Sequence, residues 1–74
     1  MNRRELWEAD AAVHRCRLAL ELGDARGWGD VDKQREALRQ VIAAEEAVAR
    51  LTGGPPCHDL DDLRRRLADL ESGG

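Results

Sequence analysis

Two cysteines and two histidines are the side chains of this 74-residue chain best suited to bind a metal ion or act as nucleophiles. His14 and Cys16 lie near each other, and Cys57 adjoins His58. Residues two apart on a helix point about 200° away from each other, so His14 and Cys16 cannot share an ion. Cys57 and His58 lack the C-x₂-C spacing of a structural zinc site. We therefore predict no metal site and no cofactor.

Cys57 alone keeps a chemical alternative open. It adjoins a histidine and precedes a predicted helix, two features that can lower the pKa of a thiol. A metal- or redox-responsive module using the Cys57–His58 loop is therefore the alternative function. No disulfide is expected, because a returning second helix would place Cys57 near residues 3–6. That is about 15 Å from Cys16, and a disulfide needs Cα atoms within about 7 Å.

Glu45 is the carboxylate in the least usual position, because it falls within the apolar face of a predicted helix, beside Val41 and Val48. Its side chain should either extend to solvent or meet an arginine or Gln34 in a polar contact that sets the helix register. A catalytic carboxylate needs a second titratable group converging on it, and none is identifiable. We predict that the chain is not an enzyme and has no catalytic residue.

Charge and hydropathy exclude two classes of partner. A net charge of −3 argues against nonspecific binding to nucleic acid and against an anionic membrane surface. Arg64, Arg65 and Arg66 form the basic cluster, and Asp61 and Asp62, four residues before the last two, should neutralise it. The first residues contain no apolar h-region, and no stretch is long enough to span a membrane. We expect a cytoplasmic protein with reduced cysteines.

The elements that must position these residues are helices. Helix-forming residues dominate, and no run of β-branched or aromatic residues indicates a strand. We expect an all-α fold with a single domain over residues 1–74, a helical hairpin plus a third, shorter helix forming a small three-helix bundle. Leu, Ile and Val make up 15 of the 74 residues, so the core is small and self-association would stabilise it. The predicted helices span residues 3–22, 31–52 and 60–71, with 72–74 a frayed tail.

Residues at the predicted helix ends support these bounds. Asn2, Asp30 and Asp59 are each suited to an N-cap position. Gly23 and Gly53 follow the first two helices, where a glycine commonly ends a helix.

Apolar periodicity predicts how the helices pack. The second helix carries a broad apolar face, which suits an element packed against two neighbours. The first and third helices each carry a narrower stripe with 3-4 spacing, so both should pack on the second. The stripes consist of Leu6, Ala9, Val13, Cys16 and Leu20 in the first helix and of Leu60, Leu63, Leu67 and Leu70 in the third.

A second apolar stripe lies on the opposite side of the first helix. Either the third helix covers it, or it is an exposed strip, which in a soluble protein usually marks an interface. We favour the interface, and so a non-enzymatic protein–protein interaction module, a regulator, inhibitor or accessory subunit that forms a homodimer or binds a larger protein. Trp28, in the loop between the first two helices, either tucks over the bundle end or meets the partner. The predicted interface residues are Trp7, Ala11, His14, Leu18, Leu22 and Trp28.

Overall fold

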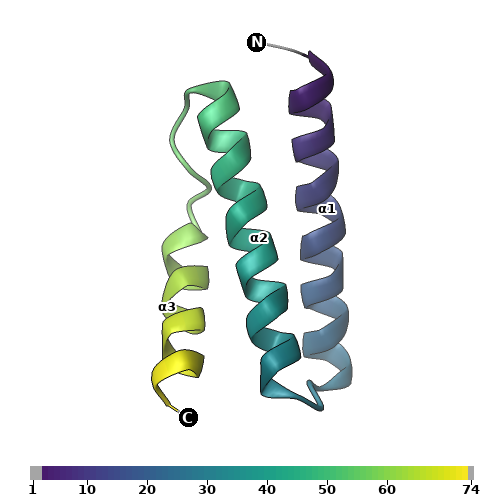
Figure 1. Ribbon diagram of the computed structural model, residues 1–74, viewed down its shortest axis with the longest axis vertical. Coiled ribbons are helices and arrows are strands. Elements are labelled where there is room, and N and C mark those ends of the chain that lie inside the picture. Colours follow the sequence, from purple (N-terminus) through teal and green to yellow (C-terminus); the bar gives the residue numbers. More distant parts are fainter. Residues whose placement is uncertain (1–2, 74) are drawn as a thin grey trace.

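Three helices make up the computed structural model, which describes residues 3–73 and has no strand in that range. α1 spans Arg3–Arg26, α2 spans Val31–Thr52 and α3 spans Leu60–Ser72. α1 and α2 form an antiparallel hairpin, and α3 runs back along the lower half of α2 (Figure 1). The predicted all-α fold, a hairpin followed by a shorter third helix, is confirmed.

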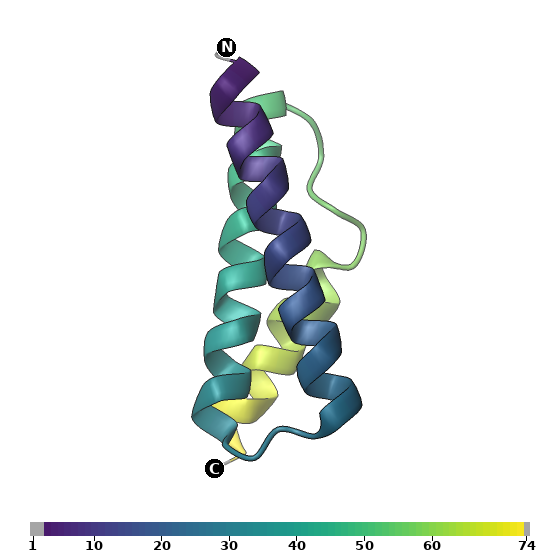
Figure 2. The same ribbon diagram turned by 90° about the vertical axis from the view of Figure 1, so that its right-hand side faces the viewer.

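The connection between α2 and α3 does not run where we expected. Residues 53–59 leave the top of α2 and descend beside the hairpin, so α3 begins about halfway down (Figure 2). This path places the Cys57 thiol beside Arg17, where the arginine donates to Sγ over 3.4 Å. The predicted position near residues 3–6 is therefore wrong. Both cysteines are free, as predicted, although the separation that we used to argue this does not apply.

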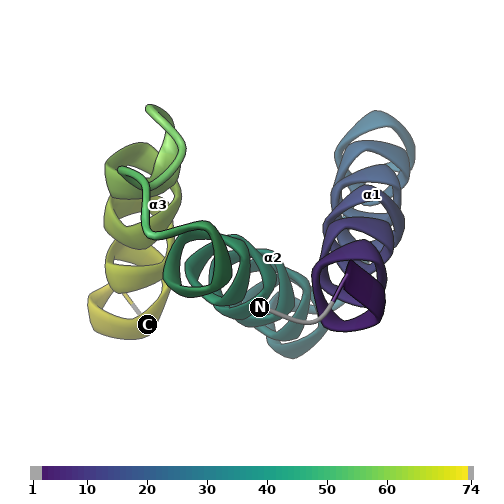
Figure 3. The same cartoon turned by 90° about the horizontal axis from the view of Figure 1, so that it is seen from above.

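α2 is the central helix, as its broad apolar face predicted. Viewed from above, α1 and α3 lie on either side of it (Figure 3). Within residues 3–73, the backbone of α2 approaches both other helices, whereas those of α1 and α3 stay apart. α1 therefore packs through one face, and its opposite face is left without a helical neighbour.

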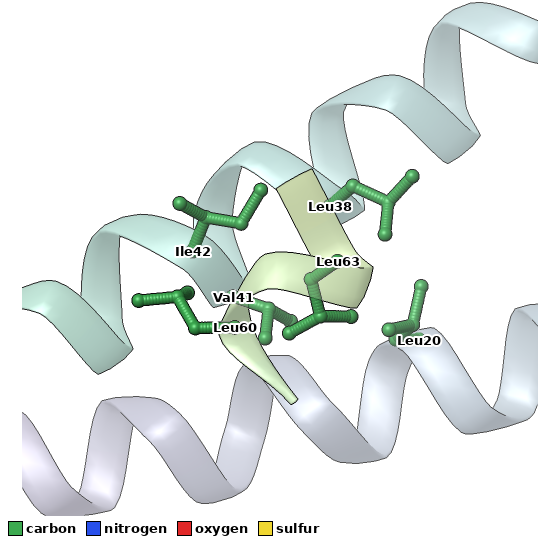
Figure 4. Packing of buried hydrophobic residues seen from close by; sticks show 6 residues of the cluster. All are labelled: Leu20, Leu38, Val41, Ile42, Leu60 and Leu63. Carbon is green, nitrogen blue, oxygen red and sulfur yellow. The ribbon is translucent and has the colours of Figure 1, made fainter. Parts of the chain in front are cut away.

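The core lies where side chains of all three helices meet over α2. Leu38 and Val41 of α2 are fully buried, and Leu60 of α3 almost so. Leu20 of α1 and Leu63 of α3 approach them from their own helices (Figure 4). At about 1.5–3 kcal/mol for each fully buried Val or Leu side chain, these contacts supply much of the free energy of folding.

The ends of α2 are capped as the sequence predicts. The Asp30 side chain accepts a hydrogen bond from the Asp32 backbone N–H over 2.8 Å. Gly53 has a φ of +69°, which favours glycine, and donates its N–H to the Ala49 carbonyl over 2.9 Å. Asn2, the predicted cap of α1, lies outside the described residues.

Gly23 does not end α1, contrary to prediction. The helix continues to Arg26, and Gly27, with a φ of +86°, ends it by donating to the Gly23 carbonyl over 2.9 Å. A Cβ at position 23 would lie 2.2 Å from the ring of Trp28. Gly23 is thus inside the helix, and it provides the space in which the indole packs.

Candidate functional site

The predicted second stripe of α1 is largely exposed. We call Trp7, Ala11, His14, Leu18 and Leu22 the outer strip. Trp7 is 71% exposed, Leu18 57% and Leu22 45%. Ala11 is half-buried, and His14 is exposed beside Asp10, at 3.5 Å one turn earlier. Figure 2 looks onto the outer side of α1, and no other helix crosses in front of it.

The third helix therefore does not cover the outer strip. Of the two predicted outcomes, burial under the third helix or exposure, the structure shows exposure. α3 packs on α2, away from the exposed side of α1 (Figure 3). Its leucine seam is directed into the core instead, with Leu60 and Leu63 buried and Leu67 and Leu70 partly buried against them.

A hollow of about 750 Å³ opens beside Trp7, at the end of the hairpin opposite the 27–30 loop. Its apolar wall comes from Leu6 and Trp7 of α1 and Val48 of α2. Its polar lining consists of Arg3, Arg4, Asp10 and Thr52. The hollow extends the apolar surface around Trp7 but is broadly open to solvent.

Trp28 lies apart from the outer strip. It is half-buried against the core and rests on Gly23, and its indole N–H donates to Asp24 over 2.7 Å. Tucking over the bundle end was one of the two predicted outcomes for this side chain. Most of its apolar surface therefore contributes to folding rather than to the exposed face of α1.

A polar cluster joins α1, α2 and the 53–59 loop around the guanidinium of Arg17. Arg17 donates two hydrogen bonds to Asp59, over 2.9 and 3.0 Å, and its Nη2 lies 3.2 Å from Oε2 of Glu45. The Cys57 thiol donates to Asp59 over 2.6 Å. The predicted contact between Glu45 and an arginine is thus present, although the sequence did not identify Arg17 as the partner.

The cluster changes the ionisation of its members. Hydrogen bonds from Arg17 and from the Cys57 thiol hold the pKa of Asp59 well below its usual value. The same Asp59 carboxylate accepts a hydrogen bond from the Cys57 thiol, which stabilises the protonated thiol and raises the pKa of Cys57. A raised pKa disfavours the thiolate, which is the nucleophile and the metal ligand. The alternative of a lowered Cys57 pKa is therefore not supported, because the acidic side chain two residues later shifts that pKa in the opposite direction.

Three acceptor atoms of this cluster have a spacing compatible with a metal ion. The ligand atoms of Glu45, Cys57 and Asp59 all lie within 4.8 Å of one another. The guanidinium of Arg17 contacts all three, so a cation would have to displace a positive charge that already neutralises the carboxylates. His58 is not part of this group and is exposed. The arrangement is that of an ion-pair network linking three segments.

Asp59 also departs from its predicted role. It occupies the N-cap position of α3, but its side chain makes no capping hydrogen bond, because both carboxylate oxygens accept from Arg17. The residue therefore fixes the start of α3 to α1 and not to the first turn of its own helix.

The arginine cluster of α3 is neutralised, as expected, although by different partners. Arg64 lies 3.3 Å from Glu46 of α2 and 3.6 Å from Asp61, and Arg65 lies 3.6 Å from Asp62. Arg66 reaches across to Asp24 near the end of α1 and lowers the pKa of that carboxyl group. These pairings leave little net positive charge for a phosphate ligand.

No helix within residues 3–73 is long and apolar enough to cross a membrane. The chain matches no protein-family model, curated protein or solved structure.

Proposed function

We propose that this protein is a non-enzymatic interaction module that binds another protein through the outer strip of α1. The observation that carries the proposal is the exposure of Trp7, at 71%, on one helical stripe with Leu18 and Leu22 that α3 does not cover. A helix that serves a single core is expected to be polar on its opposite side.

The composition of the strip suits an interface. Tryptophan is enriched among residues that dominate binding energy, and leucines at helical spacing can enclose it. The apolar side chains alternate with small or polar ones, and charged residues flank the line. This arrangement resembles an apolar centre with a polar rim, the usual anatomy of a protein interface.

The polar cluster supports a structural role and not an enzymatic one. Arg17 neutralises the carboxylates of Glu45 and Asp59. The raised pKa of Cys57 favours its protonated, less reactive form. Among the described residues, no buried polar side-chain atom lacks a hydrogen-bond partner. A metal- or redox-responsive function of the Cys57–His58 loop ranks second, because the carboxylate of Asp59 opposes formation of the thiolate.

Position-specific photo-crosslinking tests the proposal in the native host. Leu18 is replaced by p-benzoylphenylalanine in the full chain, and a matched chain carries the same residue at exposed Asp61 of α3. We expect a discrete crosslinked product from position 18 and none from position 61. The additional substitutions Trp7→Glu and Leu22→Glu should abolish the product while circular dichroism shows an intact helical fold. Equal crosslinking from both positions, or none from position 18, would contradict the proposal.

A further inference from the structure

We propose that the surface bound by the outer strip is the outer strip of a second copy of this chain, in antiparallel orientation. This inference rests on the proposed function and adds the identity of the partner and the register of the pair. It is drawn from the order of charged and apolar residues along α1, together with the exposure of that face.

The charges at the two ends of the strip are opposite. Arg4 precedes Trp7 by about one turn, and Glu21 follows Leu18 by about one turn, on the opposite edge of the strip. In a parallel pair in register, each of these charges would face its own copy, and His14 would face His14. An antiparallel pair brings Arg4 and Glu21 of the two copies to the same level along the axis at both ends, although on opposite edges of the strip, so their attraction favours this orientation over the parallel one.

One register satisfies the apolar residues and the charges together. With Trp7 placed against Leu18 of the second copy, the small Ala11 faces His14 and leaves room for the imidazole. Leu22 then reaches the first turn of the other α1, where it can cover the aliphatic stem of an arginine. Twofold symmetry makes each contact occur twice, as in other isologous dimers.

The same register pairs the flanking charges. Glu8 and Arg15 lie seven residues apart on one edge of the outer strip, and both are exposed. Within one copy they are about 10 Å apart along the helix axis, too far to form an ion pair, and Glu8 instead lies 3.9 Å from Arg4 in an exposed pair one turn earlier. Arg15 makes no ion pair with any described residue. In the antiparallel pair Glu8 and Arg15 of the second copy lie on the same edge, offset by two residues or about 3 Å along the axis, and this pairing occurs twice.

The fold leaves room for such a pair. α2 and α3 lie on one side of α1, and its other side is open along the helix (Figure 3). α1 has 24 residues and is about 36 Å long, so two of them can align over several turns without contact between the other helices.

Charge reversal in the full chain tests both the partner and the register. Sedimentation equilibrium of the wild type should give a mass of twice 8.2 kDa at high concentration. Arg15→Glu places like charges together at two symmetric points and should raise the dimer dissociation constant about tenfold, as should Glu8→Arg. The double variant Glu8→Arg/Arg15→Glu restores both attractions and should return to within about threefold of the wild type. A parallel dimer would not be rescued, since these two side chains do not meet in it.

Matched controls separate the pairing from the total charge. Lys33→Glu changes the net charge as Arg15→Glu does, and Asp69→Arg matches Glu8→Arg, both at exposed sites away from the outer strip. Neither control should alter the dissociation constant, and circular dichroism should show every variant folded. A dimer without rescue in the double variant overturns the antiparallel register. A wild type that stays monomeric overturns self-association, whereas a crosslink from position 18 to a different protein would still support the interaction module.

Discussion

Arg17 of α1 donates to both carboxylate oxygens of Asp59, a residue 42 positions later at the start of α3. This pair, extended by Glu45 and Cys57, ties together α1, α2 and the 53–59 loop, whereas the backbones of α1 and α3 do not approach each other. Together with the pair between Arg66 and Asp24, it sets the position of α3 relative to α1, and substitution of Asp59 tests its contribution.

Asp59→Asn should destabilise the protein by about 1–3 kcal/mol at pH 7, since Arg17 loses a charged, two-point acceptor in a partly buried site. Urea denaturation followed by circular dichroism measures the change in the free energy of unfolding. Asp62→Asn is the control, because Asp62 forms an exposed pair one turn from Arg65, and its loss should cost less than about 0.5 kcal/mol. Equal effects of the two variants would mean that the Arg17 pair is not formed in solution.

The same pair predicts a specific acid dependence. Because Arg17 lowers the pKa of Asp59 in the folded state, the stabilisation is present above the unfolded pKa of about 3.9 and is lost as the pH falls through the folded value. Asp24, held by Arg66, contributes in the same direction. Unfolding free energies measured between pH 2 and 6 should fall less steeply for Asp59→Asn than for the wild type. Parallel profiles would contradict this assignment.

Cys57 should react slowly with iodoacetamide. The Asp59 carboxylate raises the pKa of the thiol, so the thiolate fraction near pH 8 is lower than in the unfolded chain, whose thiol pKa is about 8.5. A Cys16→Ala background isolates the measurement to Cys57. Alkylation should be slower in the native state than in urea, and Asp59→Asn should accelerate it. A native rate above the unfolded rate would instead favour a reactive loop cysteine.

Gly23→Ala should be destabilising by about 1 kcal/mol, although alanine is the better helix former by a similar amount. The added Cβ would meet the Trp28 ring at 2.2 Å, so the indole has to leave its site. In a Trp28→Ala background that obstacle is gone, and the same substitution should become stabilising by about 0.5–1 kcal/mol. A double-mutant cycle from urea denaturation measures this change of sign; equal effects in both backgrounds would rule out the contact.

Leu60→Ala should cost about 2–5 kcal/mol, because Leu60 is almost fully buried between α3 and α2. Leu67→Ala, at a half-buried site in the same helix, should cost less. Denaturant unfolding gives the free energy of unfolding of each variant and so compares the fully buried Leu60 with the half-buried Leu67. A change near zero for Leu60→Ala would show that α3 is detached from the hairpin in solution.

Local signals in the sequence predicted much of the fold. The bounds of α2 follow from an aspartate that accepts from the first turn and a glycine in the left-handed region, both properties of neighbouring residues. The breadth of its apolar face predicted its central place, because two neighbours require more surface than one. The same reasoning applied to α1 left open whether α3 covers the outer strip, and favoured the exposure that the structure shows.

Contacts between distant residues could not be predicted in this way. The role of Gly23 depends on where Trp28 packs, and the role of Asp59 depends on a loop path that brings Arg17 within reach. Cys57 was misplaced for the same reason, since the loop could equally have stayed at the end of the hairpin. Arg17 itself lies between the two apolar stripes of α1, where an arginine usually extends into solvent.

The arrangement of the connections has a consequence for the order of folding. The hairpin closes over residues 27–30, whereas the contacts that tie α3 to α1 join residues 42 positions apart. Loop-closure entropy is smaller for the short connection, so α1 and α2 should associate first and create the surface on which α3 docks. In the reverse direction α3 is the segment expected to separate first, exposing the apolar face of α2 while the hairpin is still paired.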